Sequence, residues 1–159
     1  MNGNAWIDEG DMFPDFIVEL STGGNVRLTD LLGRRAVLFF YPKDDTPGCT
    51  GEAKDFSALK FRFDAAGIMV LGISKDAPDR HRKFIAKHGL TVPLASDLDE
   101  PGLSDRLDIW AEKSLYGRTY TGMVRTTFLL EPNGRIARVW RKVKVAGHAA
   151  ETLNAALAS

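Results

Sequence analysis

The sequence contains only one cysteine, Cys49, among its 159 residues. A single cysteine excludes a disulfide within the chain, and it excludes the Cys-x-x-Cys pair on which dithiol reductases depend. Such a chain suits a compartment that keeps thiols reduced, so we expect the protein in the cytoplasm. The scarcity also makes this thiol the first candidate for a reactive group.

An excess of one charge and long hydrophobic runs are also missing. The 21 basic and 21 acidic residues cancel, and neither sign gathers into a block, so binding to nucleic acid or to an anionic membrane is not expected. The longest apolar runs, such as residues 36–41, are far too short to cross a bilayer. Residues 1–10 include acids and lack the apolar segment of a secretory leader.

What is present is the composition and order of an α/β domain. With 44% hydrophobic and 26% charged residues, the chain can bury a core. No repeat or linker divides it, so residues 1–159 are predicted to form a single domain in which strands and helices alternate around a central sheet. Predicted strands cover 16–20, 26–28, 36–41, 68–73, 94–96, 124–130 and 135–140, and predicted helices cover 29–32, 47–66, 78–88, 102–107 and 148–157.

Two of these predicted elements meet at Cys49. Residues 36–41 are apolar on both faces, which is typical of a central strand that is covered on each side. The segment after the cysteine has apolar residues every three or four positions and predicts an amphipathic helix that ends at Gly67. These apolar positions are Ala53, Phe56, Leu59, Phe63 and Ala66.

The position of Cys49 favours its anionic form. Thr46 is typical of a helix N-cap and Pro47 of the first helical position, which places the cysteine in the first turn. Unpaired backbone N–H groups and the positive end of the helix dipole would stabilise a thiolate there, and the thiolate is the nucleophilic form. A free cysteine is also often an inert part of a hydrophobic core. The Thr-Pro-Gly sequence before Cys49 favours the reactive role.

Two stretches of the sequence resemble one family. Pro42, Thr46 and Cys49 have the Pro-x-x-x-Thr-x-x-Cys spacing of the peroxiredoxins, which are thiol peroxidases. Residues 46–53 and 110–129 are similar to the bacterioferritin comigratory protein branch, also called peroxiredoxin Q. The resemblance covers nearly the whole chain and implies the thioredoxin-like fold, a central mixed sheet flanked by helices. In the second stretch the matching residues are Trp110-Ala111-Glu112-Lys113-Ser114, Gly117, Tyr120, Gly122, Arg125 and Thr127-Phe128-Leu129.

The resemblance also implies which residues form the site. Cys49 attacks the peroxide, Thr46 and Arg125 donate hydrogen bonds to it, and Pro42 shields the pocket from water. Arg125 also donates to the sulfur, and Glu52, one turn after the cysteine, orients Arg125. The residues alone also allow Arg125 to be an exposed cation at a strand end, and Glu52 to be a solvated carboxylate that complements the helix dipole.

One departure from the family pattern determines the expected cycle. Many members of this branch carry a second, resolving cysteine five residues after the first, and here that position is Lys54. Others carry it in the next long helix, where residues 80–88 contain none. A sulfenic acid on Cys49 must then be reduced by an external thiol. We expect an antioxidant peroxidase that reduces hydrogen peroxide and small organic hydroperoxides, with thioredoxin, glutaredoxin or glutathione as the reductant. We expect it to be a monomer or weak homodimer and to need no metal, haem, flavin or selenium.

Other interpretations remain open. Asp44 and Asp45 have the ligand type of a metal site, but without nearby histidines they are expected to be turn residues. Trp110 and Tyr120 are expected at the rim of the site, or as ordinary aromatics. A noncatalytic interaction module on the same fold is also possible. A cysteine-histidine hydrolase would need a histidine beside Cys49, and the chain offers His81, His88 and His148.

Overall fold

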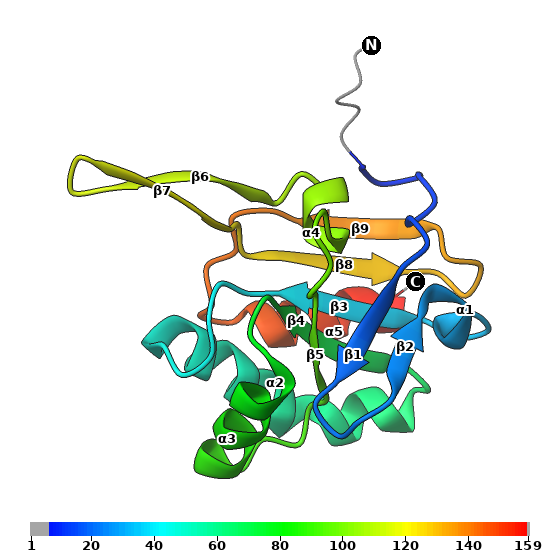
Figure 1. Ribbon diagram of the computed structural model, residues 1–159. Helices are drawn as coiled ribbons and strands as arrows, with labels where there is room; N and C mark the ends of the chain where they lie inside the picture. Colours follow the sequence, from blue (N-terminus) through cyan, green and yellow to red (C-terminus); the bar gives the residue numbers. More distant parts are fainter. Residues whose placement is uncertain (1–6, 159) are drawn as a thin grey trace.

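The computed structural model describes residues 7–158, and within them seven strands form one mixed sheet (Figure 1). Their order is β2-β1-β5-β4-β3-β8-β9, with β3 parallel to β4 and antiparallel to β8. This arrangement confirms the predicted α/β class with a central mixed sheet. The strands are β1 (Ile17–Leu20), β2 (Asn25–Arg27), β3 (Ala36–Phe40), β4 (Met69–Ser74), β5 (Leu94–Ser96), β8 (Thr126–Leu130) and β9 (Ile136–Trp140).

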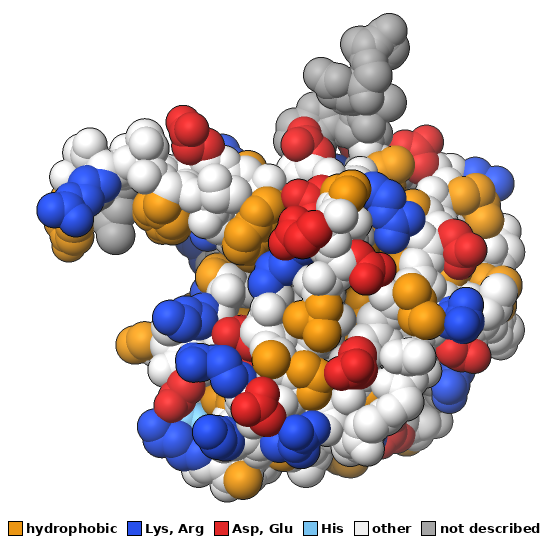
Figure 2. All heavy atoms as spheres, in the orientation of Figure 1, with side chains coloured by type: hydrophobic (Ala, Val, Ile, Leu, Met, Phe, Trp, Pro, Cys, Tyr) orange, Lys and Arg blue, Asp and Glu red, His pale blue; other side chains and the backbone are white. Residues whose placement is uncertain are grey.

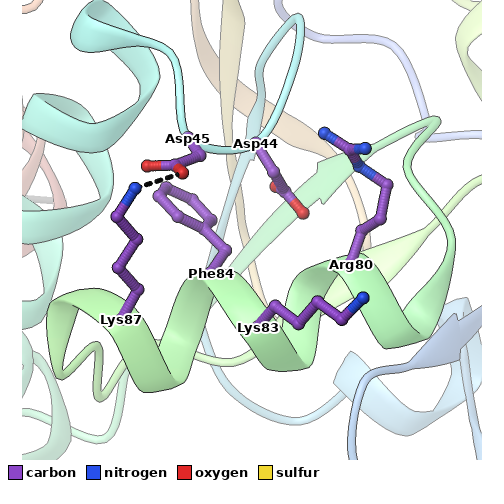
Figure 3. A pocket seen from close by; sticks show the side chains of 6 residues that line it. All are labelled: Asp44, Asp45, Arg80, Lys83, Phe84 and Lys87. Carbon is purple, nitrogen blue, oxygen red and sulfur yellow. Dashed lines mark hydrogen bonds and ion pairs between the residues drawn. The ribbon is translucent and has the colours of Figure 1, made fainter.

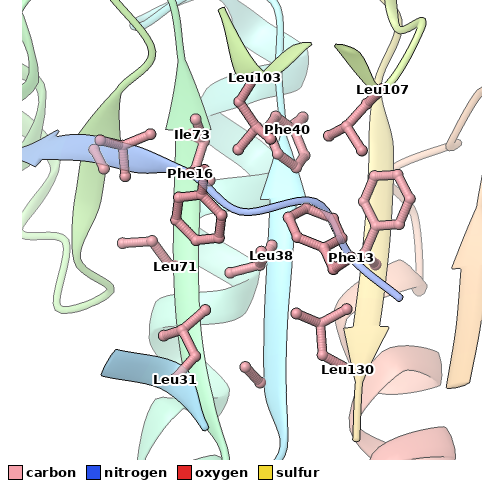
Figure 4. Packing of buried hydrophobic residues seen from close by; sticks show 14 of the residues in the cluster. Phe13, Phe16, Leu31, Leu38, Phe40, Leu71, Ile73, Leu103, Leu107 and Leu130 are labelled. Atoms are coloured by element: carbon pink, nitrogen blue, oxygen red, sulfur yellow. The ribbon is translucent and has the colours of Figure 1, made fainter. Parts of the chain in front are cut away.

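Helices cover the two faces of the sheet unequally. One face packs against α2 (Pro47–Ala65), α3 (Pro78–His88) and α5 (His148–Ala158). The other face packs against an N-terminal segment and the short helices α1 (Leu28–Leu31) and α4 (Leu103–Arg106) (Figure 4). No helix within residues 7–158 is long and apolar enough to cross a membrane.

The central strand β3 explains why its sequence is apolar without alternation. Val37 and Phe39 belong to the cluster under the long helices, whereas Leu38 and Phe40 belong to the cluster on the opposite face. The Phe39 ring stacks on Phe56 of α2, with centroids 4.4 Å apart. A strand buried on both faces needs an apolar residue at every position, as predicted for residues 36–41.

A projecting arm was not predicted from the sequence. β6 (Trp110–Leu115) and β7 (Arg118–Met123) pair with each other as a separate antiparallel ribbon that extends from the body (Figure 1). Its turn contains Tyr116 and Gly117, both with positive φ (52° and 76°). Most of its side chains are exposed. Because the ribbon has no continuous apolar face, its sequence lacks the usual hydrophobic pattern of a strand.

Two predicted helices bury different residues from those expected. Ala66 is the exposed C-cap of α2 and not part of its buried face, and Gly67 ends the helix with a φ of 72°. In the helix predicted for residues 78–88, the apolar residues Phe84 and Ile85 are the expected anchors, but the structure buries His81 and Phe84 and leaves Ile85 half-buried. The histidine was missed because its burial depends on a polar partner from another part of the chain.

Gly72 in β4 generates a prediction about stability. A Cβ at this position would lie 2.6 Å from Phe39 Cζ and 2.7 Å from Leu94 Cδ2, both in the packed core. We expect Gly72→Ala to lower the free energy of unfolding by about 1–3 kcal/mol, as overpacking does. Urea unfolding followed by circular dichroism measures this change.

The matched control is Gly51→Ala in α2, where the nearest atom to a new Cβ is Val145 Cγ1 at 3.7 Å. Alanine favours a helix over glycine by about 1 kcal/mol, so this variant should be as stable as the parent or more stable. Equal destabilisation by both variants would contradict the packing argument.

Candidate active site

The first turn of α2 carries the thiol. Thr46 is the N-cap of this helix and Pro47 its first residue, so Cys49 lies in the first turn, as predicted. The Thr50 N–H donates to Thr46 O at 2.8 Å and closes that turn. Cys49 is a free cysteine that is 2% exposed and packs in the same cluster as Tyr41. The sulfur therefore lies just under the surface, at the positively polarised end of a long helix.

A guanidinium connects this sulfur to a carboxyl group. Arg125 lies between β7 and β8, and its Nη2 donates to Cys49 Sγ at 3.5 Å. Its Nη1 donates to Glu52 Oε1 at 2.7 Å. Its backbone O accepts from the Val143 N–H at 3.0 Å, which holds this segment in place. The fold thus brings together a cysteine and an arginine that are 76 residues apart in the sequence.

Gly48 leaves room for the guanidinium, a role that sequence reasoning missed. A Cβ at Gly48 would lie 3.1 Å from Arg125 Nη2. That distance is tight for a nonbonded contact, so a larger residue would press on the group that contacts the sulfur. The glycine of the Thr-Pro-Gly-Cys sequence therefore shapes the site directly.

Burial dominates the electrostatics of the acid. It raises the pKa of Glu52 to about 7, although the charge and hydrogen bond of Arg125 oppose the rise. Burial also disfavours the charge of Arg125, but Cys49 and Glu52 together outweigh that effect and raise the pKa of the arginine. Glu52 is 1% exposed and the Arg125 side chain 16% exposed. Neither residue is the solvated surface charge that the sequence alone also allowed.

The other two expected site residues lie in the loop between β3 and α2. The Thr46 hydroxyl donates to Lys43 O at 2.9 Å and does not cap the helix with its side chain. Pro42 is half-buried at the start of the same loop. Within residues 7–158, Cys49 Sγ has its hydrogen bond from Arg125 and none from Thr46.

A buried polar network fixes this loop to the body. Asp44 Oδ1 accepts from the Tyr41 hydroxyl at 2.6 Å, and Oδ2 lies 2.7 Å from His81 Nδ1. The Asp44 N–H donates to Asp76 Oδ2 at 2.8 Å. Burial, aided by the charge of Asp44, holds the pKa of Tyr41 well above its ordinary value, so the hydroxyl stays a donor. The loop is thereby tied to α3 and to the segment that follows β4.

The neighbouring Asp45 is tied to the end of α3. Its carboxyl oxygens lie 2.7 Å from Lys87 Nζ and 2.8 Å from His88 Nε2, and these hydrogen bonds lower its pKa. Asp44 and Asp45 line a small pocket together with Arg80, Lys83, Phe84 and Lys87 (Figure 3). The φ of Asp45, 61°, fits the turn role that was predicted for this residue.

The expectation that no histidine lies near the two aspartates is wrong. His81 pairs with Asp44, and His88 pairs with Asp45. The third histidine, His148, lies elsewhere, with Nε2 2.8 Å from Thr127 Oγ1. Among the described residues no group of histidine, cysteine and acidic side chains could hold a metal ion, and no histidine is hydrogen-bonded to Cys49.

A second cation reaches the site from the arm. Lys113 lies opposite Tyr120 in the ribbon, and its Cδ would be 3.4 Å from a Cβ on Gly122. Partial burial and the charge of Arg125 lower the pKa of Lys113, while Cys49 opposes the change. Sequence reasoning named Lys113 only as part of a matching stretch. Tyr120 is 48% exposed on the arm, which projects from the body (Figure 2). Trp110 is half-buried, and the Lys75 ammonium lies over its ring.

Comparison with known proteins matches the chain over almost its whole length. The model of the AhpC/TSA family matches residues 9–139. Peroxiredoxin Bcp of Xanthomonas campestris is 48% identical over 141 residues, which cover 89% of this chain and 88% of that protein. Peroxiredoxin Bcp of Bacillus subtilis is 42% identical over 147 residues, which cover 92% and 93%.

Solved structures agree with these sequence matches. A cysteine-to-serine mutant of Xanthomonas campestris peroxiredoxin Q superposes with a TM-score of 0.84 at 47% identity, covering 90% of each chain. A cysteine-to-serine mutant of Xylella fastidiosa PrxQ gives a TM-score of 0.90 at 38% identity, covering 98% of each chain. The chain therefore belongs to the AhpC/TSA family, as a peroxiredoxin of the bacterioferritin comigratory protein type with a thioredoxin-like fold, and peroxiredoxins are thiol peroxidases.

Proposed function

We propose that this protein reduces hydrogen peroxide and small organic hydroperoxides through a sulfenic acid on Cys49, which an external thiol then reduces. The observation that carries the proposal is the contact of Arg125 with both Cys49 Sγ and Glu52. A guanidinium beside a sulfur at a helix N-terminus favours the thiolate, which is the attacking species. One Xanthomonas campestris structure is named for the alkyl peroxide reduction activity of its bacterioferritin comigratory protein, which supports the substrate class.

The chemistry needs hydrogen-bond donors as well as a nucleophile. The Cys49 thiolate attacks the terminal peroxide oxygen, a sulfur–oxygen bond forms, the O–O bond breaks, and water or an alcohol leaves. Charge develops on the departing oxygen, and fixed donors that are aimed at it lower the barrier. In this proposal Arg125 and the Thr46 hydroxyl supply these donors, while Pro42 keeps water from the sulfur. The Thr46 hydroxyl would exchange its bond with Lys43 O for one with the peroxide.

The cycle is proposed to use one cysteine. Lys54 and the helix α3 provide no second thiol. Xanthomonas campestris peroxiredoxin Q, by contrast, has been solved with two different cysteines replaced by serine. The reductant of the Cys49 sulfenic acid is therefore proposed to be thioredoxin, glutaredoxin or glutathione. A free thiol of this kind fits the cytoplasm, and a monomer or weak homodimer suffices because the proposed site is built within one chain.

Replacement of the nucleophile tests the first step. We expect Cys49→Ser to lose peroxidase activity, because a serine hydroxyl is not ionised at neutral pH, while the far-ultraviolet circular dichroism spectrum is unchanged. The parent protein, treated with one equivalent of peroxide, should react with a sulfenic-acid reagent at Cys49. Mass spectrometry locates the adduct, and substantial turnover by the serine variant would refute the assignment.

Replacement of Arg125 tests the donor. Arg125→Lys keeps a positive charge but loses the two-pronged contact with Cys49 Sγ and Glu52. Loss of such a donor typically lowers the rate by about 10²–10³-fold, and we expect a loss of this order in the rate constant for peroxide, measured by stopped flow. Arg138→Lys is the matched control, since Arg138 is an exposed arginine paired with Glu151 on the surface. A normal rate in Arg125→Lys would remove the main support for the proposal.

The choice of reductant tests the one-cysteine cycle. Peroxide consumption is measured in parallel with glutathione, a thioredoxin system and a glutaredoxin system. We expect at least one of them to sustain many turnovers, and each chain to consume one peroxide when thiol is omitted. Activity with no thiol, or inactivity with all three, would contradict the proposed cycle.

A further inference from the structure

Two acidic groups contact the same guanidinium beneath the surface of the site. Cys49 Sγ lies 3.5 Å from Arg125 Nη2, and Glu52 Oε1 lies 2.7 Å from Nη1. Both acids are almost fully buried, 2% and 1% exposed. The other oxygen of Glu52, Oε2, is buried without a hydrogen-bond partner among the described residues. A buried carboxylate oxygen without a donor is costly, and the neutral carboxylic acid is much less so.

Counting charges on these three groups singles out two protonation states. A thiol with an ionised Glu52 leaves the charge of Arg125 balanced, and so does a thiolate with a protonated Glu52. If Cys49 and Glu52 were both ionised, the three groups would carry an excess negative charge that only Lys113, on the arm, could offset. If both were protonated, the charge of Arg125 would be unpaired. The two balanced states differ only in which of the two groups holds one proton.

We propose that Glu52 keeps within the site the proton that Cys49 gives up, so that the thiolate and the carboxylic acid form together. Its use in catalysis rests on the proposed peroxidase function. The step Cys-S⁻ + Glu-COOH + ROOH → Cys-SOH + Glu-COO⁻ + ROH balances atoms and charge. Sulfur is oxidised, the O–O bond is reduced, and the departing oxygen receives the proton that Glu52 held.

The surroundings of Glu52 support this assignment. Burial raises its pKa to about 7, against Arg125, and the charge of Asp55 on the same helix adds to the rise. Lys113 of β6 acts on Cys49 and Arg125 from the arm, with a pKa that burial and Arg125 lower. His148 of α5 has its own pKa lowered by burial, with Glu151 opposing and Arg125 adding to the shift. A carboxyl that titrates near neutrality can hold and release a proton under working conditions.

Proton counting during alkylation of Cys49 tests the proposal without any peroxide. Iodoacetamide converts the sulfur to a neutral thioether in weakly buffered solution near neutral pH, and a pH-stat measures the protons set free. Because the proton is shared by the pair, the parent protein should release about one proton per chain, whichever group holds it. In Glu52→Gln, no carboxyl stores the proton and Arg125 stabilises only the thiolate, so we expect the release to fall towards none. Asp64→Asn, which removes an exposed carboxyl from the C-terminal end of the same helix, should behave like the parent.

Two results would overturn the proposal: a parent protein that releases no proton, or a Glu52→Gln variant that releases as many as the parent. Infrared difference spectroscopy of the parent with isotope-labelled glutamate then shows which group holds the proton, and it does not require that Glu52→Gln folds. The carboxylic acid band of Glu52 should then be exchanged for a carboxylate band when Cys49 is alkylated, and an unchanged spectrum would contradict the inference. Failure of the peroxidase assays would count against the proposed function and leave the proton count unaffected.

Discussion

The contact between Arg125 and its two acidic neighbours is the interaction on which the site depends. A guanidinium has a planar fork of donors, so it can hold a sulfur with one arm and a carboxyl group with the other. Burial makes both contacts stronger than they would be in water, and it also makes an unbalanced charge expensive. The proposed reactivity of the site and its proposed sensitivity to protonation therefore depend on the same feature.

The register of the sheet positions that guanidinium. β3 and β8 are antiparallel, and Phe40 at the end of β3 lies opposite Thr126 at the start of β8. Arg125, the residue before β8, therefore lies at the end of the sheet where the chain leaves β3 for the loop to α2. This loop is held by the contacts of Asp44, and it places Cys49 at the same end of the sheet. A slip of one residue in this pairing would turn Arg125 to the opposite face of the sheet.

Local sequence patterns were sufficient for most of the fold. The apolar run 36–41 and the N-cap at Thr46 each depend on neighbouring residues, and the structure contains the elements that they predict. The arm formed by β6 and β7 was missed because its exposed residues carry no hydrophobic pattern. The prediction of a single domain is not tested by the fold and stays a prediction.

Only part of the site could be predicted from the sequence in this way. A motif and its resemblance named Cys49, Glu52 and Arg125, and the structure brings them together, but their roles stay predictions until they are measured. The partners of Asp44 could not be read from the sequence, because His81 lies 37 positions away and only the packing of α3 on the sheet makes them neighbours. Burial of Glu52 was equally hidden, since a first-turn acid looks the same whether water or an arginine faces it.

The absence of a second thiol is consistent with how α3 is held. His81 is buried against Asp44, and Lys87 and His88 bind Asp45, so α3 and the loop before Cys49 are linked at both ends of the helix. Phe84, between these links, is buried in the same cluster as Cys49. A cycle that carried a thiol from α3 to the oxidised sulfur would have to break a buried polar pair and withdraw an aromatic side chain, and both changes are costly. A thiol that arrives from solution leaves these contacts intact, so the links between α3 and the loop favour an external reductant on structural grounds as well as on the cysteine count.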